Sequence, residues 1–254
     1  MNEEKQLVTI SHELTRAAYS MSLNEKRILL KAAAELDSYG QPDQLIEINA
    51  GMCAEFYSMN PKSAYRHLAT AIERLWDRTL VLKDGTRMRW VITSKYEEGR
   101  ILIKFHPDLN PHLLDLKEKF TRYLLSRAAS FKLLYSWRIF ELIMQYKATG
   151  YLKIGLDEFK TALEIPKSYD KDFGLIRSKV INPAVKEIKE KDGLKITWKP
   201  IKTGRKVTAL EFKFPVEPQK ELPLSKAYIE QHAQPGETYQ QAKDRLAKKQ
   251  KTVA

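Results

Sequence analysis

The side chains best suited to chemistry in this sequence are cations on a predicted helix over 169–191. Arg177 carries a planar guanidinium, which can donate two parallel hydrogen bonds to the O6 and N7 atoms of a guanine. Lys171 and Lys179 are compact point charges and suit phosphate oxygens better. Because the early residues of such a helix reach base edges in the major groove, this pattern predicts contact with DNA.

The place of Arg177 on this helix leaves two interpretations open. On an ideal α-helix Arg177 falls on the apolar side with Val180 and Ala184, which favours a structural ion pair. If Pro183 shifts the helical register, or if the long side chain extends past the edge of the core, Arg177 can instead contact a base. Lys179 points outward in either case.

A predicted hairpin follows this helix, and its connection at 201–205 is basic. Lys202 and Arg205 lie in the connection, and Lys206 begins the returning strand. A helix followed by a hairpin with a basic tip is the layout of a winged-helix DNA-binding domain. We expect the three tip cations to contact a phosphate or to enter the minor groove.

A smaller set of candidate DNA contacts lies in the first half of the chain. Lys62, Ser63 and Arg66 occupy the outer side of an equivalent helix, and Arg87 and Arg89 follow its hairpin turn. These residues predict backbone contacts, while the second half specifies sequence. An ordinary solvated face is the alternative.

No residue pattern predicts catalysis. The chain lacks a G-x-x-x-x-G-K-[S/T] phosphate loop and a G-x-G-x-x-G turn. Its five histidines form neither a His-x-His pair nor an H-E-x-x-H motif, so a metal-dependent nuclease has no visible ligand set. Cys53 is the only cysteine and is expected to be a buried thiol. We expect no enzymatic activity, no cofactor and no metal.

The composition points to an anionic partner. A formal net charge of +12 accompanies 43% hydrophobic and 30% charged residues, which is typical of a folded, soluble protein. Nucleic acid is the commonest anionic partner, and acidic lipid is the alternative. There is no apolar run of about 18 residues and no signal-peptide layout, so we expect a cytoplasmic protein without a membrane partner.

Short-range patterns predict the elements that would position these cations. In the first half we expect helices at 22–36, 50–57, 61–76 and 109–116, and strands at 45–48, 79–83, 87–94 and 100–105. In the second half we expect helices at 131–146, 157–163 and 169–191, and strands at 151–154, 194–200 and 206–214. The helix over 131–146 is apolar on most sides and should be central, and Tyr65 and Trp76 should be in the core. Residues 1–12 should be loose.

The two halves repeat one order of parts. Strand, short helix, Pro-Lys-Ser, long helix and hairpin occur in both, with Pro-Lys-Ser at 61–63 and again at 166–168. A period of roughly a hundred residues is too long for a solenoid. The sequence therefore predicts an α+β protein of two tandem winged-helix domains related by an internal pseudo-repeat. The predicted units are 1–119, 120–216 and a flexible basic tail over 217–254, in which a helix over 240–251 is the alternative.

Several strings resemble one family, the iteron-binding plasmid replication initiators (the bacterial initiator Rep family). They are Glu13-Leu-Thr-Arg-Ala-Ala-Tyr-Ser-Met-Ser-Leu-Asn-Glu-Lys-Arg27, Phe120-Thr-Arg-Tyr123, Ser136-Trp-Arg-Ile-Phe-Glu-Leu142, and the stretch from Phe173 through Pro183-Ala-Val-Lys-Glu-Ile188. Singly they are short, but together they keep the family's order over residues 7–214. The tail beyond Phe214 has no counterpart among them.

The resemblance implies functions that spacing alone does not. Such proteins bind double-stranded DNA at origin repeats (iterons) as monomers, help to melt an adjacent AT-rich segment, and recruit the host initiator and replicative helicase. As dimers, pairing through the first domain, they bind an operator inverted repeat and repress their own gene. By position, Arg177, Ser178 and Lys179 would read sequence, and Lys62, Ser63 and Arg66 would add contacts.

Three alternatives remain open from the sequence. A transcriptional regulator would have the same two domains without a role in initiation. A nicking enzyme of rolling-circle replication would need a His-rich metal site and a reactive tyrosine. A membrane-surface protein would need a basic amphipathic helix with exposed aromatic side chains.

Overall fold

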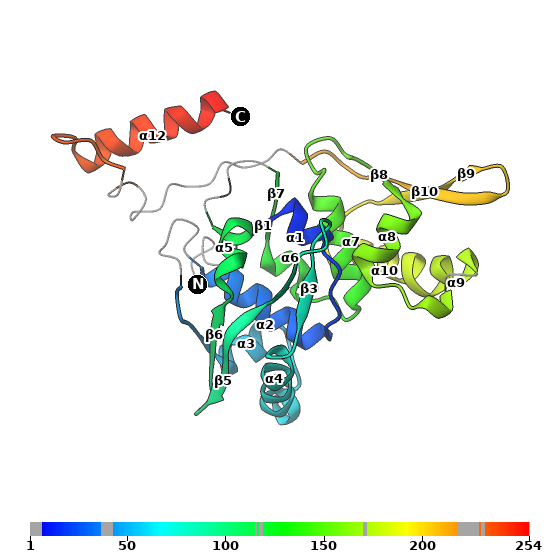
Figure 1. The fold of residues 1–254 in the computed structure, drawn as a ribbon, viewed down its shortest axis with the longest axis horizontal. Coiled ribbons are helices and arrows are strands. Elements are labelled where there is room, and N and C mark those ends of the chain that lie inside the picture. The colour runs from blue at the N-terminus through cyan, green and yellow to red at the C-terminus, as the bar shows by residue number, and fades with distance from the viewer. Residues whose placement is uncertain are drawn as a thin grey trace.

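The described chain contains two three-stranded antiparallel sheets that share the same topology (Figure 1). It is a computed structural model that describes residues 7–36, 43–114, 116, 119–169, 172–217, 229 and 232–253, with side chains as far as residue 246. In the first sheet β6 (Arg100–Phe105) lies between β2 (Ile46–Asn49) and β5 (Val91–Glu97).

The second sheet repeats this arrangement. There β10 (Lys206–Lys213) lies between β8 (Tyr151–Gly155) and β9 (Thr197–Thr203), so the first strand again pairs with the second strand of a hairpin. The side chains of β2 and β8 alternate between buried and exposed, because one face of each sheet packs on the core.

Helices fill the interval between the first strand of each sheet and its hairpin. In the first half these are α3 (Ala50–Phe56) and α4 (Pro61–Leu75), and in the second half α8 (Leu156–Leu163) precedes a longer, interrupted helix. The shared order confirms the predicted α+β fold of two winged-helix units related by a pseudo-repeat. The predicted boundary between residues 119 and 120 stays a prediction.

The described chain begins with a strand, so the prediction of a loose start was wrong from residue 7 onward. β1 (Leu7–Ser11) pairs antiparallel with β7 (Phe120–Leu124), which the sequence analysis also missed. Val8 and Ile10 are buried in the core. Two such short strands are stable only when paired, and their partners lie far apart in the sequence, so no local pattern predicts them.

The predicted capping box at the first long helix is confirmed. Ser22 accepts the backbone N–H of Glu25 at 3.3 Å, and Glu25 accepts the backbone N–H of Ser22 at 2.9 Å, at the start of α2 (Leu23–Glu35). Two N–H groups that lack partners within the helix are thereby satisfied. α1 (His12–Arg16) precedes α2 and is capped by Ser11.

The hairpin after α4 differs from the prediction. β3 (Thr79–Val81) and β4 (Arg87–Arg89) form a separate two-stranded sheet, and the strand expected over 87–94 is interrupted at Trp90 before β5 begins. The pseudo-repeat therefore assigns the role of first wing to β5 and β6. β3 and β4 are an addition that has no equivalent in the described second half.

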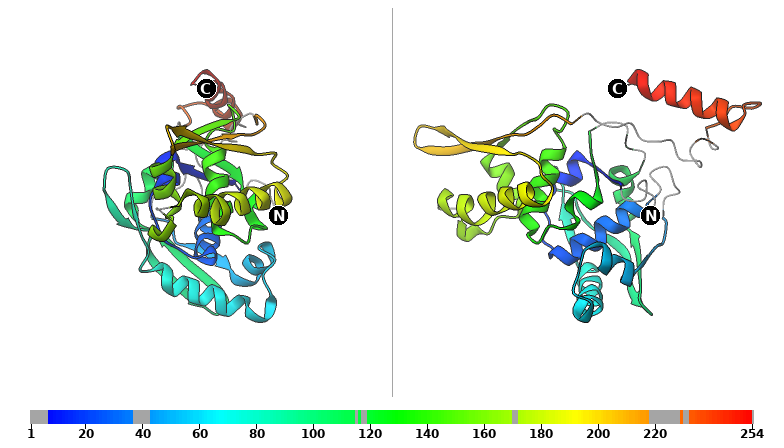
Figure 2. Two further views of the ribbon diagram at one scale, coloured as in Figure 1. Left: turned by 90° about the vertical axis from the view of Figure 1, so that its right-hand side faces the viewer. Right: turned by 180° about the vertical axis from the view of Figure 1, so that it is seen from behind.

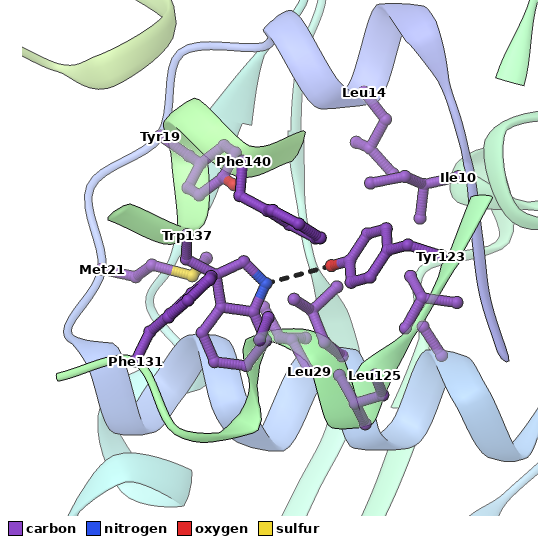
Figure 3. Packing of buried hydrophobic residues seen from close by; sticks show 14 of the residues in the cluster. Ile10, Leu14, Tyr19, Met21, Leu29, Tyr123, Leu125, Phe131, Trp137 and Phe140 are labelled. Carbon is purple, nitrogen blue, oxygen red and sulfur yellow. Dashed lines mark hydrogen bonds between the residues drawn. The ribbon is translucent and has the colours of Figure 1, made fainter. Parts of the chain in front are cut away.

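The most apolar helix lies at the centre, as predicted. Nine consecutive residues of α7 (Leu134–Met144) are buried, from Ser136 onward. α7 contacts α1 and β7 on one side and α8 and α10 (Asn182–Lys191) on the other, so one continuous core joins the two halves. Figure 3 shows Trp137 among Phe131, Phe140 and Tyr123 in this core. Between the halves run η2 (Pro107–Leu109) and α5 (Asn110–Leu113), where one helix over 109–116 was expected. α6 (Leu125–Ala129), which follows β7, was not predicted.

In the described part of the tail, the helical alternative is confirmed. α12 (Tyr239–Val253) is a helix that lies apart from both sheets in Figures 1 and 2. Ile229, Ala242 and Leu246 form a small buried cluster of their own. Residues 218–228 lie outside the described part of the chain.

Candidate nucleic-acid interface

The basic helix of the second half begins later than the sequence predicted. η3 (Lys167–Tyr169) is a single 3₁₀ turn, and α9 (Phe173–Ile176) starts after it. Asp172 caps α9 by accepting the backbone N–H of Gly174 at 2.7 Å. Lys171, a predicted phosphate contact, lies outside the described residues.

A π-helical turn, η4 (Arg177–Ile181), joins α9 to α10. Asn182 donates its backbone N–H to the carbonyl of Arg177, five residues back, where an α-helix uses the carbonyl four residues back. Pro183 follows directly, and it has no N–H to donate to the carbonyl of Lys179. The helical register therefore shifts next to Pro183. This is the register shift that was considered as a means for Arg177 to face solvent instead of the core.

The candidate reading residues on this turn all face solvent. Arg177, Ser178 and Lys179 are exposed, whereas Ile176 and Val180 on either side are buried. No ion pair joins Arg177 or Lys179 to any residue that the structure describes, so the structural ion pair considered for Arg177 is absent from that part of the chain. Uncompensated cations on an exposed helical turn attract an anionic partner.

The second wing carries the other predicted cations. β9 begins three residues later than expected and runs on to Thr203, so the connection is the two-residue turn Gly204-Arg205 and not the whole of 201–205. Gly204 has φ +61°, a conformation that glycine adopts without strain. Lys202, Arg205 and Lys206 are exposed at this tip and, among the described residues, form no ion pair.

Aromatic rings pack the reading helix against the sheet that carries the second wing. The rings of Phe173 and Trp198 lie 6.5 Å apart, and those of Trp198 and Phe212 lie 6.4 Å apart. α9 is thereby held against the sheet that carries the wing. No role was predicted for Trp198, although it lies on a predicted strand of the wing.

In the first half, α4 presents two of the predicted cations. Asn60 caps α4 by accepting the backbone N–H of Lys62 at 3.0 Å. Lys62 and Arg66 are exposed, and Ser63 is half-buried near the N-terminus of the helix. The positive end of the helix dipole adds to the attraction for a phosphate here.

Trp76 and Tyr65 are not in the core, contrary to expectation. Trp76 is 44% exposed and Tyr65 is 51% exposed. The buried stripe of α4 consists of Ala64, Leu68, Ala71, Ile72 and Leu75, so small alanines occupy the positions that the prediction gave to the aromatic rings.

The remaining predicted contacts, Arg87 and Arg89, lie on β4 and not on the first wing. The Arg89 guanidinium lies over the ring of Trp76, 5.2 Å from the ring centre. Arg87, two residues earlier on the same strand, is exposed. The exposed Trp76 ring therefore has a cation–π partner, and Arg89 has a partner within the protein.

The two wings differ in charge. At the tip of the first wing Lys95 pairs with Glu97 at 2.9 Å, and Arg100 lies 3.5 Å from Glu98 and 3.7 Å from Glu47. These opposite charges offset each other, whereas the cations at the tip of the second wing have no such counterpart among the described residues. The structure thus brings the stronger anion-attracting surface together in the second half.

Within the described residues, no group of three or more His, Cys, Asp or Glu side chains is placed to hold a metal ion. Cys53 is buried, and burial raises its thiol pKa to about 11. No helix in the part of the chain that is described has the length and apolar character to cross a membrane.

Two family models match the chain. The model described as initiator replication protein, WH1, matches residues 7–144, and the model described as initiator Rep protein, WH2, matches residues 155–214. The chain belongs to the initiator replication protein family. The first matched segment contains the first sheet and its helices and extends to the end of α7, and the second runs from α8 through β10.

Relatives extend the likeness over most of the chain. It is 25% identical over 228 residues to a replication initiation protein of Escherichia coli, covering 84% of this chain and 70% of that protein. It is 27% identical over 250 residues to the PI protein of Escherichia coli, covering 81% of each. Among solved structures, the Pi initiator protein in complex with iteron DNA matches with a TM-score of 0.73 at 25% identity, covering 86% of this chain and all of the other.

Proposed function

We propose that this protein initiates plasmid DNA replication by binding repeated sites, or iterons, in double-stranded DNA at the origin. The observation that carries the proposal is the exposed cationic surface of the second winged helix, formed by Arg177, Lys179 and the tip of the β9–β10 wing. The likeness to the Pi initiator, whose structure contains iteron DNA, supports the same partner for this chain.

Binding energy in this proposal comes from two sources. Lysines at the wing tip and on α4 neutralise phosphates and release counterions, which gives affinity without sequence preference. Arg177, Ser178 and Lys179 supply the preference by reaching base edges in the major groove. Because one continuous core joins the two halves, one duplex would meet both in a fixed arrangement.

Several parts of the proposed role go beyond contact with DNA. Self-association through the first domain and repression of the protein's own gene belong to the proposal. So do recruitment of a host initiator and helicase, a place in the cytoplasm, and action without a catalytic centre or cofactor. Repeated copies on bent DNA would drive origin melting, with the cost of deformation offset by contact energy.

Footprinting on the DNA that flanks the gene tests the proposal. We expect a series of short direct repeats to be protected in phase, at protein concentrations that leave random DNA unprotected. Uniform protection, or none, would contradict it. A plasmid that carries only the gene and these repeats should replicate, and failure to replicate despite tight repeat binding would favour a transcriptional regulator.

A further inference from the structure

The spacing of the buried residues along the reading helix includes one residue more than a continuous α-helix needs. Val180 and Ile181 follow Ile176 by four and five residues, and Ala184 follows it by eight. All four are at most 1% exposed. At about 100° per residue, a continuous α-helix would place Val180, Ala184 and Ile181 about 40°, 80° and 140° from Ile176, so the buried face would be centred close to Arg177 and not on Ile176.

A continuous α-helix would therefore place Arg177 over the core. Val180, Ile181 and Ala184 stand three, four and seven residues after Arg177, and each is 0% exposed. A guanidinium on that stripe would be buried without a partner, at a high cost. The π-turn accommodates the additional residue, and it rotates α9 relative to α10 by about 100°, the angle of one α-helical residue.

Pro183 sets the place of this turn. Its ring collides with the carbonyl four residues back in an α-helix, here that of Lys179, and it has no N–H to donate. The π-turn occupies the five residues Arg177–Ile181, and α9 and α10 on either side are regular α-helix. The irregularity is thus confined to the segment whose side chains are expected to read DNA.

The two pieces that the turn joins are held by different neighbours. Phe173 on α9 packs against Trp198 of the wing sheet, with ring centres 6.5 Å apart. α10 packs against the central helix α7. Because each piece is fixed separately, the turn between them alone decides how Arg177, Ser178 and Lys179 project.

We propose that Pro183 is a positioning residue for DNA recognition. Through the π-turn it keeps Arg177, Ser178 and Lys179 outward together, in the geometry with which they meet the base edges. This rests on the proposed function, since it concerns the same helix and the same ligand.

The test is Pro183→Ala, assayed on a duplex of the footprinted repeat and on a scrambled duplex of equal length. Alanine permits the α-helical register, so we expect the preference for the repeat to fall about 10- to 100-fold, the range that one or two misplaced base contacts give. Affinity for the scrambled duplex should stay within about twofold, because the charge is unchanged. The backbone amide that this substitution introduces should become protected from hydrogen exchange as it bonds to the carbonyl of Lys179.

A second variant, Pro183→Leu, also restores the backbone N–H and permits the α-helical register, so it should lose the preference in the same way. The matched control Pro215→Ala replaces an exposed proline outside the reading helix and the wing tip, and it should retain the preference. Preference retained in both Pro183→Ala and Pro183→Leu would overturn the proposal. Unfolding of both would also overturn it, because the turn would then serve the fold alone.

The wild-type protein separates this inference from the proposed function. If it shows no preference for the repeat, the proposed function fails. If it and Pro183→Ala show the same preference, only the role of Pro183 fails.

Discussion

Lys26 and Glu141 form an ion pair inside the core, 2.8 Å apart, with side chains 3% and 1% exposed. Lys26 also donates to the Tyr19 hydroxyl, Tyr123 donates its hydroxyl to Glu141, and Trp137 donates its indole N–H to Tyr123 (Figure 3). Burial, together with the neighbouring Glu141 carboxylate, raises the pKa of Tyr123 well above its ordinary value, so this hydroxyl stays protonated as a donor. The network links α2 to α7.

Removing one member of this pair should cost far more than removing both. Glu141→Leu leaves the Lys26 ammonium buried without its anion, and we expect a loss of about 3–5 kcal/mol in the free energy of unfolding. The double variant Lys26→Met with Glu141→Leu should recover most of that loss, as measured by urea unfolding. Losses that simply add would show that the two charges do not depend on each other.

At the start of α2, Glu25 has two roles and Ser22 has one. Ser22→Ala removes a cap and should cost about 1 kcal/mol. Glu25→Ala should cost more, because Glu25 also accepts two hydrogen bonds from Arg78, at 2.8 and 3.0 Å, while 0% exposed. Thermal or urea unfolding of the two variants checks the order, and an equal loss in both would mean that the pair with Arg78 adds nothing.

At the scale of elements, the second wing should act through its charge. Replacing Lys202, Arg205 and Lys206 together with alanine keeps the turn glycine, so the hairpin should persist. The slope of log K against log salt should become shallower by about 0.9 for each phosphate that the variant no longer neutralises. Lys199→Ala is the matched control, because Lys199 already lies 3.2 Å from Glu211 within the wing. An unchanged slope in the triple variant would mean that the tip does not contact phosphates.

Elements with strong local signals could be predicted from the sequence, and elements that depend on distant partners could not. The capping box, the Pro61 helix start and the glycine turn of the second wing follow from nearby residues alone. β1 and β7 could not be found, because each is stabilised by the other across the intervening domain. The error at Tyr65 and Trp76 came from giving large aromatic rings priority over Ala64 and Ala71 on the buried stripe.

The candidate interface shows the same division. The exposed cations of α4 and the second wing, and Lys179 on η4, were predicted from residue type and periodicity, whereas periodicity placed Arg177 on the apolar side and left its role open. The π-turn was foreseen only as a possible register shift near Pro183, since an ideal helix was assumed up to that residue. The separation of β4 from the first wing was missed, because the bend at Trp90 interrupts a run that otherwise has good strand character.

At the scale of the whole molecule, the two halves form one body. Arg16 on α1 donates to Gln145 at 2.9 Å and to the Tyr146 hydroxyl at 2.7 Å, and it pairs with Glu158 on α8. Arg138 on α7 donates to the backbone carbonyls of Tyr19 at 2.8 Å and Ala17 at 3.0 Å. Contacts of this kind fix the distance between the two reading helices, so both can bind one duplex only in a set spacing.

A paired titration tests most directly whether the second half reads sequence while charge supplies general affinity. Wild-type protein and Arg177→Ala are titrated against the footprinted repeat and a scrambled duplex at one salt concentration. Arg177→Ala should lose about 1–3 kcal/mol of binding free energy on the repeat and much less on the scrambled duplex. Equal losses on both duplexes would contradict a base-reading role and leave Arg177 as a phosphate contact only.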